Sequence, residues 1–318
     1  MHRRAFLQTV AGASAGLVVA RGPRPADAAT LTVASTTGAL GVLTQVIQRA
    51  KLEEKFDLTL DVKVLDPAAA EKTVLLRQVD AGLFPVISAA DVNLKGQQIV
   101  LFGPLLYMHS FIVVWNDSPA QSFADLRGKK FALLDKVSGA YRGMEVLAAH
   151  QGWNFQKDFE LVTAPPPAVI TFLQRKQVDA IVMHEPLTSK LLAEGKFRVV
   201  MGLNEQWKKE RKSDWLFLCL AAHREWLDKN RAPAKRLAEM FMEAARLIRR
   251  DPALIGAEAK FLGLKTPREI ELAQERLPRF LPTEWNEGAV AAVRDVVEEA
   301  VRLKQVPKAP AGDYIAVL

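Results

Sequence analysis

The chain has 318 residues, of which 49% are apolar and 25% are charged, a balance typical of a folded protein with one large or two ordinary domains. This composition excludes a disordered chain, a collagen and a low-complexity scaffold. The single cysteine, Cys219, excludes an internal disulfide framework and any zinc site that needs two thiolates.

Residues 1–28 carry the features of a secretory signal peptide in the expected order. Arg3 and Arg4 precede a weakly apolar stretch from Thr9 to Ala20, and Ala26-Asp27-Ala28 supplies the small-residue cleavage pattern. The Arg-Arg-x-Phe-Leu core resembles the twin-arginine type, so we expect export to the periplasm. A short N-terminal helix is the alternative. Cleavage would remove four arginines and one aspartate, lowering the formal net charge from +7 to +4.

The remaining basic residues are spread along the chain rather than clustered. The densest run, from Lys208 to Lys212, is interrupted by Glu210 and has no interleaved aromatic residue. We interpret it as a solvated loop, because a nucleic-acid surface needs a clustered basic stripe. No nucleic-acid partner is therefore expected.

Short apolar runs alternate with helical spacings over most of the chain. Strands are predicted at 31–34, 58–64, 81–87, 99–102, 111–115, 130–134, 159–163, 178–183, 197–201 and 215–221. Helices are predicted at 42–52, 71–78, 141–151, 168–175 and 186–194, and nearly everything after residue 224 is helical. This alternation indicates an α/β fold with largely parallel sheets. Two α/β blocks, near 29–110 and 116–214, precede a helical block.

Several segments occur in the order seen in one family of transport proteins. They are the strand, polar loop and helix of Leu31–Leu52, then Gln78-Val79-Asp80-Ala81-Gly82, Ser122–Ala132, Lys136-Val137-Ser138-Gly139 and Ala168–Pro186. Together they resemble the solute-binding proteins of ABC importers, in the nitrate/sulfonate/taurine group that includes SsuA-like and NMT1-like proteins. Glutamine replaces the usual glycine before both Val-Asp-Ala motifs, and 83–103 departs from the family pattern, which leaves the ligand class open.

The resemblance implies a periplasmic-binding-protein type II fold. Two α/β lobes with mixed, mostly parallel sheets would close over a ligand, with a helical C-terminal region. We expect residues 29–110 plus 222–318 to form lobe 1 and residues 111–221 to form lobe 2. The implied partners are a small-molecule ligand and the permease and ATPase subunits of an importer. A monomer without a cofactor is expected.

The candidate ligand contacts lie in four loops at predicted strand ends. Ligands of α/β folds bind there, and helix N-termini offer free N–H groups to polar or anionic ligands. The residues are Ser35, Thr36, Thr37, Gly38, Phe84, Ser88, Lys136, Ser138, Gly139, Tyr141, His184, Glu185 and Trp215. The first loop and Ser138 could equally be plain helix N-caps, and Lys136 could be a solvated lysine.

The aromatic candidates and the histidines also have simpler interpretations. Phe84, Tyr141 and Trp215 could be core residues, although two or more in the cleft would favour an aromatic or heterocyclic ligand. His109 is expected at the core edge or in a linker rather than as a ligand contact. His184 and Glu185 have no third partner nearby, so no metal site is expected.

Three functions remain open from the sequence. The first is a non-catalytic periplasmic receptor that captures a small polar or anionic organic solute by closure of its lobes. The second is an enzyme on the same fold, resembling menaquinone-pathway enzymes or thiamine-pyrimidine synthases. The third is a periplasmic sensor that presents its ligand to a signalling receptor.

Overall fold

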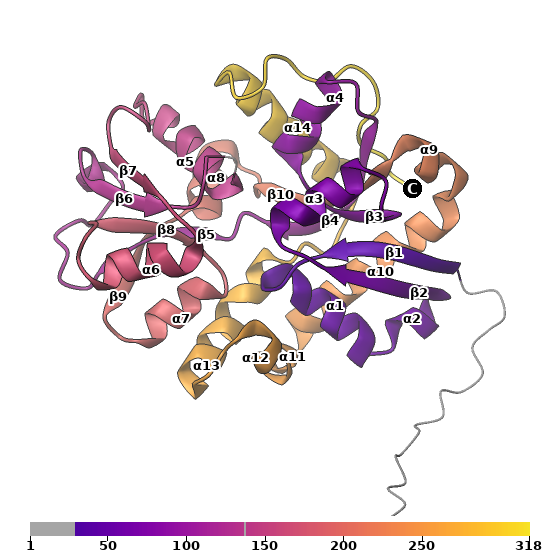
Figure 1. The fold of residues 1–318 in the computed structure, drawn as a ribbon, viewed down its shortest axis with the longest axis horizontal. Coiled ribbons are helices and arrows are strands. Elements are labelled where there is room, and N and C mark those ends of the chain that lie inside the picture. Colours follow the sequence, from indigo (N-terminus) through magenta and orange to yellow (C-terminus); the bar gives the residue numbers. More distant parts are fainter. Residues whose placement is uncertain (1–28, 137) are drawn as a thin grey trace, which may run out of the picture.

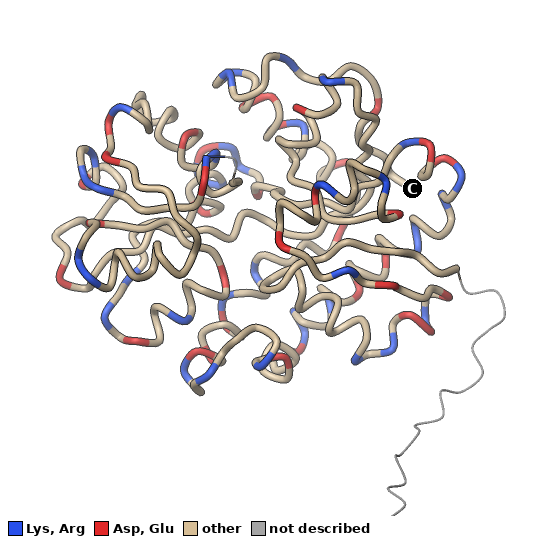
Figure 2. Tube along the Cα trace, viewed as in Figure 1, with Lys and Arg blue, Asp and Glu red and all other residues tan. Residues whose placement is uncertain are grey.

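The computed structural model describes residues 29–136 and 138–318, so the predicted signal peptide lies outside the described residues. Two α/β lobes lie side by side, each built on a five-stranded mixed sheet (Figure 1). This arrangement confirms the predicted fold class. Basic and acidic residues are interspersed over both lobes (Figure 2).

The first sheet has the order β2-β1-β3-β10-β4. Its strands are β1 (Ala29–Ser35), β2 (Leu58–Val64), β3 (Ala81–Pro85), β4 (Ile99–Tyr107) and β10 (Leu216–His223). β1 runs parallel to β2 and β3, whereas β10 is antiparallel to both of its neighbours. Leu31 and Val33 alternate with exposed or half-buried residues on β1 and face the core, as the period of a strand requires.

The second sheet repeats this plan in the order β7-β6-β8-β5-β9. Its strands are β5 (Ser110–Trp115), β6 (Lys130–Leu133), β7 (Glu160–Thr163), β8 (Ala180–His184) and β9 (Phe197–Gly202). β6 runs parallel to β7 and β8, and β5 is antiparallel to β8 and β9. In both sheets the parallel strands point their carboxyl ends toward the gap between the lobes (Figure 1).

Helices cover both sheets. Those between the strands are α1 (Ala39–Arg49), α2 (Leu52–Lys55), α3 (Pro67–Leu75), α4 (Val86–Leu94), α5 (Gly139–His150), α6 (Pro166–Gln174), α7 (Leu187–Ala193) and α8 (Leu203–Arg211), with a 3₁₀ turn at Ala124–Leu126. The predicted solvated loop at Lys208 is wrong, because Lys208 to Arg211 form the last turn of α8. Trp207 packs in the core and anchors that helix.

The C-terminal region is helical, as predicted. It comprises α9 (Arg224–Lys229), α10 (Arg231–Arg250), α11 (Ala253–Ala257), α12 (Ala259–Leu262), α13 (Pro267–Arg276), the 3₁₀ turn η2 (Leu277–Phe280) and α14 (Glu287–Arg302). α10 packs on β4 and α1 of the first lobe, while α13 packs on α7 of the second lobe. Within the described residues, no helix combines the length and the apolar character needed to cross a membrane.

The chain passes between the lobes twice. The first passage is the short link Met108–His109 between β4 and β5. The second follows α8 and ends where β10 begins, at Leu216. β10 pairs with β3 and β4 in the first sheet, whereas the sequence assigned residues up to 221 to the second lobe. The pairing therefore places 216–221 with the first lobe.

Candidate functional site

A cavity of about 180 Å³ lies between the lobes, at the carboxyl ends of their parallel strands. Both lobes contribute to its wall. The residues that line it are Thr36, Thr37, Gly38, Ala39, Leu40, Pro67, Glu71, Leu83, Pro85, Leu106, His109, Ser110, Leu134, Ser138, Gly139, Ala140, His184, Phe217 and Leu218. The wall is thus mostly apolar with a few polar groups, which is the usual composition of a small-molecule site.

Six of the predicted contact residues line this cavity: Thr36, Thr37, Gly38, Ser138, Gly139 and His184. Gly38 has a φ of 80°, a left-handed conformation that favours glycine, and no described side chain caps α1 after it. The first N–H groups of α1 therefore have no side-chain cap, and its first two residues, Ala39 and Leu40, line the cavity. Ser138 is an N-cap, since its Oγ accepts a hydrogen bond from the backbone N–H of Tyr141 at 3.2 Å.

The other predicted contacts lie elsewhere. Phe84, Tyr141 and Trp215 are at most 1% exposed and belong to the hydrophobic core, and Ser35 is buried behind the loop. Ser88 and Trp215 line a separate water-sized hollow of about 10 Å³ beside Arg142. Lys136 is exposed and is absent from the cavity wall.

Glu185 is fully buried but does not line the cavity. Its Oε1 lies 2.6 Å from Nε of Arg276, and its Oε2 accepts a hydrogen bond from Oγ of Ser189 at 2.6 Å. Both carboxylate oxygens are therefore occupied within the protein. The guanidinium of Arg276 also lies over the ring of Phe111, 4.5 Å from its centroid. Glu185 thus joins α13 to the second lobe.

Sequence reasoning missed three polar residues of the wall, Glu71, His109 and Ser110, and the aromatic ring of Phe217. Phe217 lies where the pairing of β10 with β4 shifts register, with Leu216 opposite Tyr107 and Leu218 opposite Leu106. Such a bulge redirects a side chain out of the regular alternation. The signal for His109 was its position, since the link between two lobes necessarily borders the gap between them.

His109 and His184 form a neutral pair at the cavity wall. Their ring centroids lie 5.7 Å apart in an edge-to-face arrangement. Burial lowers the pKa of His109 to about 3, helped by the nearby His184, and burial lowers the pKa of His184 to about 4. Both rings are therefore uncharged at neutral pH, and they offer the cavity hydrogen-bonding nitrogen atoms rather than positive charge.

Glu71 is the acid of the cavity wall. It projects from α3, and burial raises the pKa of its carboxyl to about 7, although the positive charge of Arg142 acts to lower it. Near neutral pH this carboxyl is divided between its protonated and ionised forms. It can consequently either donate or accept hydrogen bonds from a ligand.

The lobes approach each other closely at Gly139 and Phe217. A Cβ atom built on Gly139, at the start of α5, would lie only 2.0 Å from Cε2 of the Phe217 ring. Gly38 of the first lobe and Pro186 of the second are also neighbours, since a Cβ on Gly38 would lie at ordinary contact distance, 3.8 Å, from Cδ of Pro186. The structure therefore has its lobes closed around the cavity.

The remaining chemistry-bearing groups do not form a reactive centre in the described part of the chain. Cys219 lies fully buried in β10, and burial raises the pKa of its thiol well above the usual range, so it is a core residue rather than a nucleophile. Among residues 29–136 and 138–318, no cluster of His, Cys, Asp or Glu could hold a metal ion.

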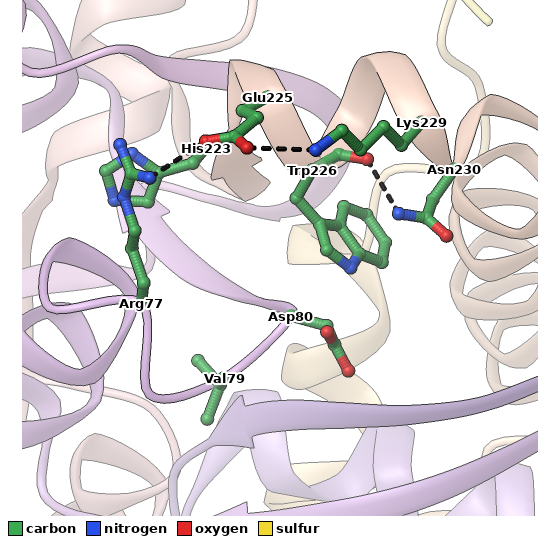
Figure 3. Close-up of a pocket in the computed structure, with 8 residues that line it drawn as sticks. All are labelled: Arg77, Val79, Asp80, His223, Glu225, Trp226, Lys229 and Asn230. Atoms are coloured by element: carbon green, nitrogen blue, oxygen red, sulfur yellow. Dashed lines mark hydrogen bonds and ion pairs between the residues drawn. The ribbon is translucent and has the colours of Figure 1, made fainter.

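A second hollow, of about 230 Å³, lies on the far side of the first lobe beside α9 (Figure 3). Its charged groups already pair with each other. Glu225 contacts Nη1 of Arg77 at 3.0 Å and Nζ of Lys229 at 2.9 Å. Asp80 accepts a hydrogen bond from the backbone N–H of Thr32 at 2.8 Å. The cavity between the lobes is the better ligand site, because within the described chain the Glu71 carboxyl forms no ion pair and Nδ1 of His109 has no hydrogen-bond partner.

Two α/β lobes that enclose a cavity at the ends of their parallel strands define the class of two-lobe solute-binding-protein folds. The sequence model of the NMT1-like family matches residues 25–263, about three quarters of the chain. The chain belongs to the NMT1-like family, which confirms the resemblance found in its motifs. No curated protein matches the sequence.

Solved structures share the fold at low sequence identity. The periplasmic aliphatic sulphonate binding protein SsuA from Escherichia coli is 21% identical, with a TM-score of 0.72 over 89% of this chain and 95% of that one. The alkanesulfonate-binding protein SsuA from Xanthomonas axonopodis pv. citri, bound to MOPS, is 18% identical, with a TM-score of 0.73 over 91% and 99%. The desulfurization enzyme DSZB is 15% identical, with a TM-score of 0.65 over 91% and 96%.

Proposed function

We propose that this protein is the periplasmic solute-binding component of an ABC importer. In this proposal the mature chain captures a small organic solute between its lobes and presents the closed form to a permease and ATPase. The observation that carries the proposal is the cavity itself, which takes residues from both lobes at the ends of parallel strands. A solute that contacts both lobes favours the closed form over the open form.

An enzymatic role has less support. The fold also occurs in a desulfurization enzyme, but fold alone does not carry function. The buried thiol of Cys219 does not line the cavity. Ser110 lies beside both wall histidines, but within the described chain no hydrogen bond joins its hydroxyl to either imidazole, as activation of a serine nucleophile requires. We therefore favour binding without turnover.

The direct test is to identify what the protein carries. Residues 29–318 would be purified from the native host and examined by native mass spectrometry, then denatured to release and identify the solute. Small-angle scattering before and after solute removal would measure closure. We expect a stoichiometric solute and a larger radius of gyration without it. Chemical conversion of that solute by the protein would refute the binding role.

We further propose that the chain reaches the periplasm by the twin-arginine route and acts as a monomer. Conversion of Arg3 and Arg4 together to lysine should leave the full-length precursor in the cytoplasm, measured by fractionation. Normal export of that variant would exclude the route but not the binding role. Sedimentation of the mature chain would measure its oligomeric state.

A further inference from the structure

The cavity wall lacks a fixed positive charge. Of the described residues that line it, none is a lysine or arginine, and Glu71 is the acid among them. His109 and His184 are buried and neutral. A sulfonate or other strong anion placed here would meet Glu71 in the wall, whereas the guanidinium of Arg142, whose Nη1 is buried without a hydrogen-bond partner in the described chain, lines the adjoining hollow.

Glu71 lacks a partner of its own. Among the described residues its carboxyl makes neither an ion pair nor a side-chain hydrogen bond, although the residue is half-buried. Arg142, on the opposite lobe, acts on it electrostatically but lines the adjoining hollow instead. A desolvated carboxyl without partners is costly, so a donor group that reaches it gains stability.

A second polar group of the wall is also unpartnered. Nδ1 of His109 is buried without a hydrogen bond of standard geometry within the described chain, although the backbone of Tyr107 lies close to the imidazole, and the residue is only 7% exposed. It lies on the link between the lobes and borders the same cavity. Leu40, Leu83 and Leu106 supply apolar surface beside these two polar groups. The cavity thus combines an apolar body with a carboxyl and an imidazole.

We propose that the cavity takes a compact organic solute that carries an amine or amidine group, and that Glu71 is the residue that recognises this group. This inference rests on the proposed solute-binding role and assigns its ligand class. An N–H donor pairs with the carboxyl, while the apolar part of the solute packs against leucine side chains and Phe217. A solute that also accepts or donates a hydrogen bond at His184 of the second lobe contacts both lobes, and it therefore favours the closed form.

The probes are benzamidine, benzylamine and benzenesulfonate, which share an apolar ring and differ in the charge of the attached group. Isothermal titration on solute-free residues 29–318 would compare wild type with Glu71→Gln. A matched control is Glu54→Gln, which alters an exposed carboxylate on α2. We expect the amidine or the amine to bind, and the Glu71→Gln change to weaken it about ten- to a hundredfold. Thermal melts would confirm that each variant folds.

The pH dependence gives a second readout. Ionised Glu71 pairs best with a cation, so the affinity for benzamidine should rise about tenfold from pH 6 to pH 8, across the pKa of about 7. His109 and His184, which line the same cavity, stay neutral over that range because their pKa values are about 3 and about 4, and Arg142 supplies a nearby positive charge. His223 contacts only the far end of α3, through the carbonyl of Leu75 at 3.1 Å. Glu71→Gln should remove this dependence.

Three results would overturn the proposal. They are the absence of binding by both nitrogen probes, equal binding by Glu71→Gln and wild type, and tighter binding of benzenesulfonate that is lost in Arg142→Gln. The last result would place an anion beside Arg142 instead. In each case a solute found by native mass spectrometry would leave the solute-binding role standing, so the two failures are distinguishable.

Discussion

An ionised Glu71 costs folding free energy, because its carboxyl is desolvated and has no ion-pair partner within the described chain. The native state therefore binds more protons than the unfolded chain between about pH 4.5 and pH 7. The contribution of this residue to stability falls as pH rises through that interval. If this carboxyl only filled space, an uncharged side chain could replace it at little cost in folding free energy. Recognition of a ligand gives a reason for the destabilising carboxyl at this position.

Glu71→Gln should accordingly stabilise the solute-free protein more at pH 8 than at pH 5. We expect the difference in the free energy of unfolding to be about 1–3 kcal/mol, since one unit of pKa shift corresponds to about 1.4 kcal/mol. Denaturant titrations at both pH values would measure it, with Glu54→Gln as the unchanged control. An equal effect at the two pH values would show that the carboxyl titrates normally.

Burial of His109 and His184 has the opposite effect on how the free energy of unfolding changes with pH. Their pKa values are about 3 and about 4 in the folded protein against 6.5 for the free side chain, so the folded state is favoured above pH 6.5 and loses this advantage as pH falls. His109→Gln should lose less stability than wild type between pH 6.5 and pH 5, by up to about 2 kcal/mol. Melts across this range would test the difference, and parallel curves would contradict it.

Helix α13 connects the C-terminal region to the second lobe through Arg276 and Glu185. The carboxylate is fully buried and the guanidinium is 18% exposed. Removing one member of such a pair leaves an uncompensated buried charge, which is far more costly than losing a surface ion pair. The helix therefore depends on one ionic contact in addition to its packing on α7.

We expect Arg276→Met to destabilise the protein by about 3 kcal/mol. Adding Glu185→Gln should recover part of that loss, because the unpaired charge is removed. Arg268→Met is the matched control: Arg268 pairs with Glu271 on the exposed face of the same helix and should contribute at most about 0.5 kcal/mol. Denaturant midpoints of wild type, Arg276→Met, Arg276→Met combined with Glu185→Gln, and Arg268→Met would measure these differences. Equal destabilisation by Arg276→Met and Arg268→Met would contradict the prediction.

Helix α14 makes a second connection between the lobes. It packs on α4 and β10 of the first lobe. Its Glu299 contacts His150 of α5 and the neighbouring Arg302, and its Asp295 contacts Arg211 of α8. α13 and α14 thus join both lobes on separate faces, which restricts the motion available at the two strand passages.

Closure of the whole molecule depends on a small residue at the interface. Gly139→Ala would force the Phe217 ring to move, either into the cavity or away from the opposite lobe. We expect this variant to fold with nearly unchanged stability in its open form but to bind the native solute at least about tenfold more weakly, a loss of about 1.4 kcal/mol. Titration combined with small-angle scattering would test this, and unchanged affinity and compaction would refute it.

The sequence predicted the two-lobe architecture because apolar runs and helical spacings are local signals. The strand predicted at 58–64 matches the structure residue for residue. α4 was missed because the apolar run at 81–87 reads as one strand, whereas the strand ends at Pro85 and the helix begins at once. Proline at that position ends the strand pairing.

The site was only partly predictable. Thr36 to Gly38 and Ser138 follow strand ends, so their place at the cavity was readable from the order of elements. Glu71 and Phe217 were not, because one depends on burial produced by the opposite lobe and the other on a bulge in β10. The partner of Glu185 lies 91 residues away along the chain, a distance over which local patterns carry no information.

β10, which lies between β3 and β4 in the first sheet, follows the whole second sheet in the amino-acid sequence. β3 and β4 each pair with β10, so the middle of that sheet stays open until residues 216–223 have been synthesised. The second sheet is formed from one continuous stretch, 110–202, and can be completed earlier. During synthesis the second sheet can therefore be completed before the first, and the edges of β3 and β4 that pair with β10 stay exposed to aggregation until β10 is made.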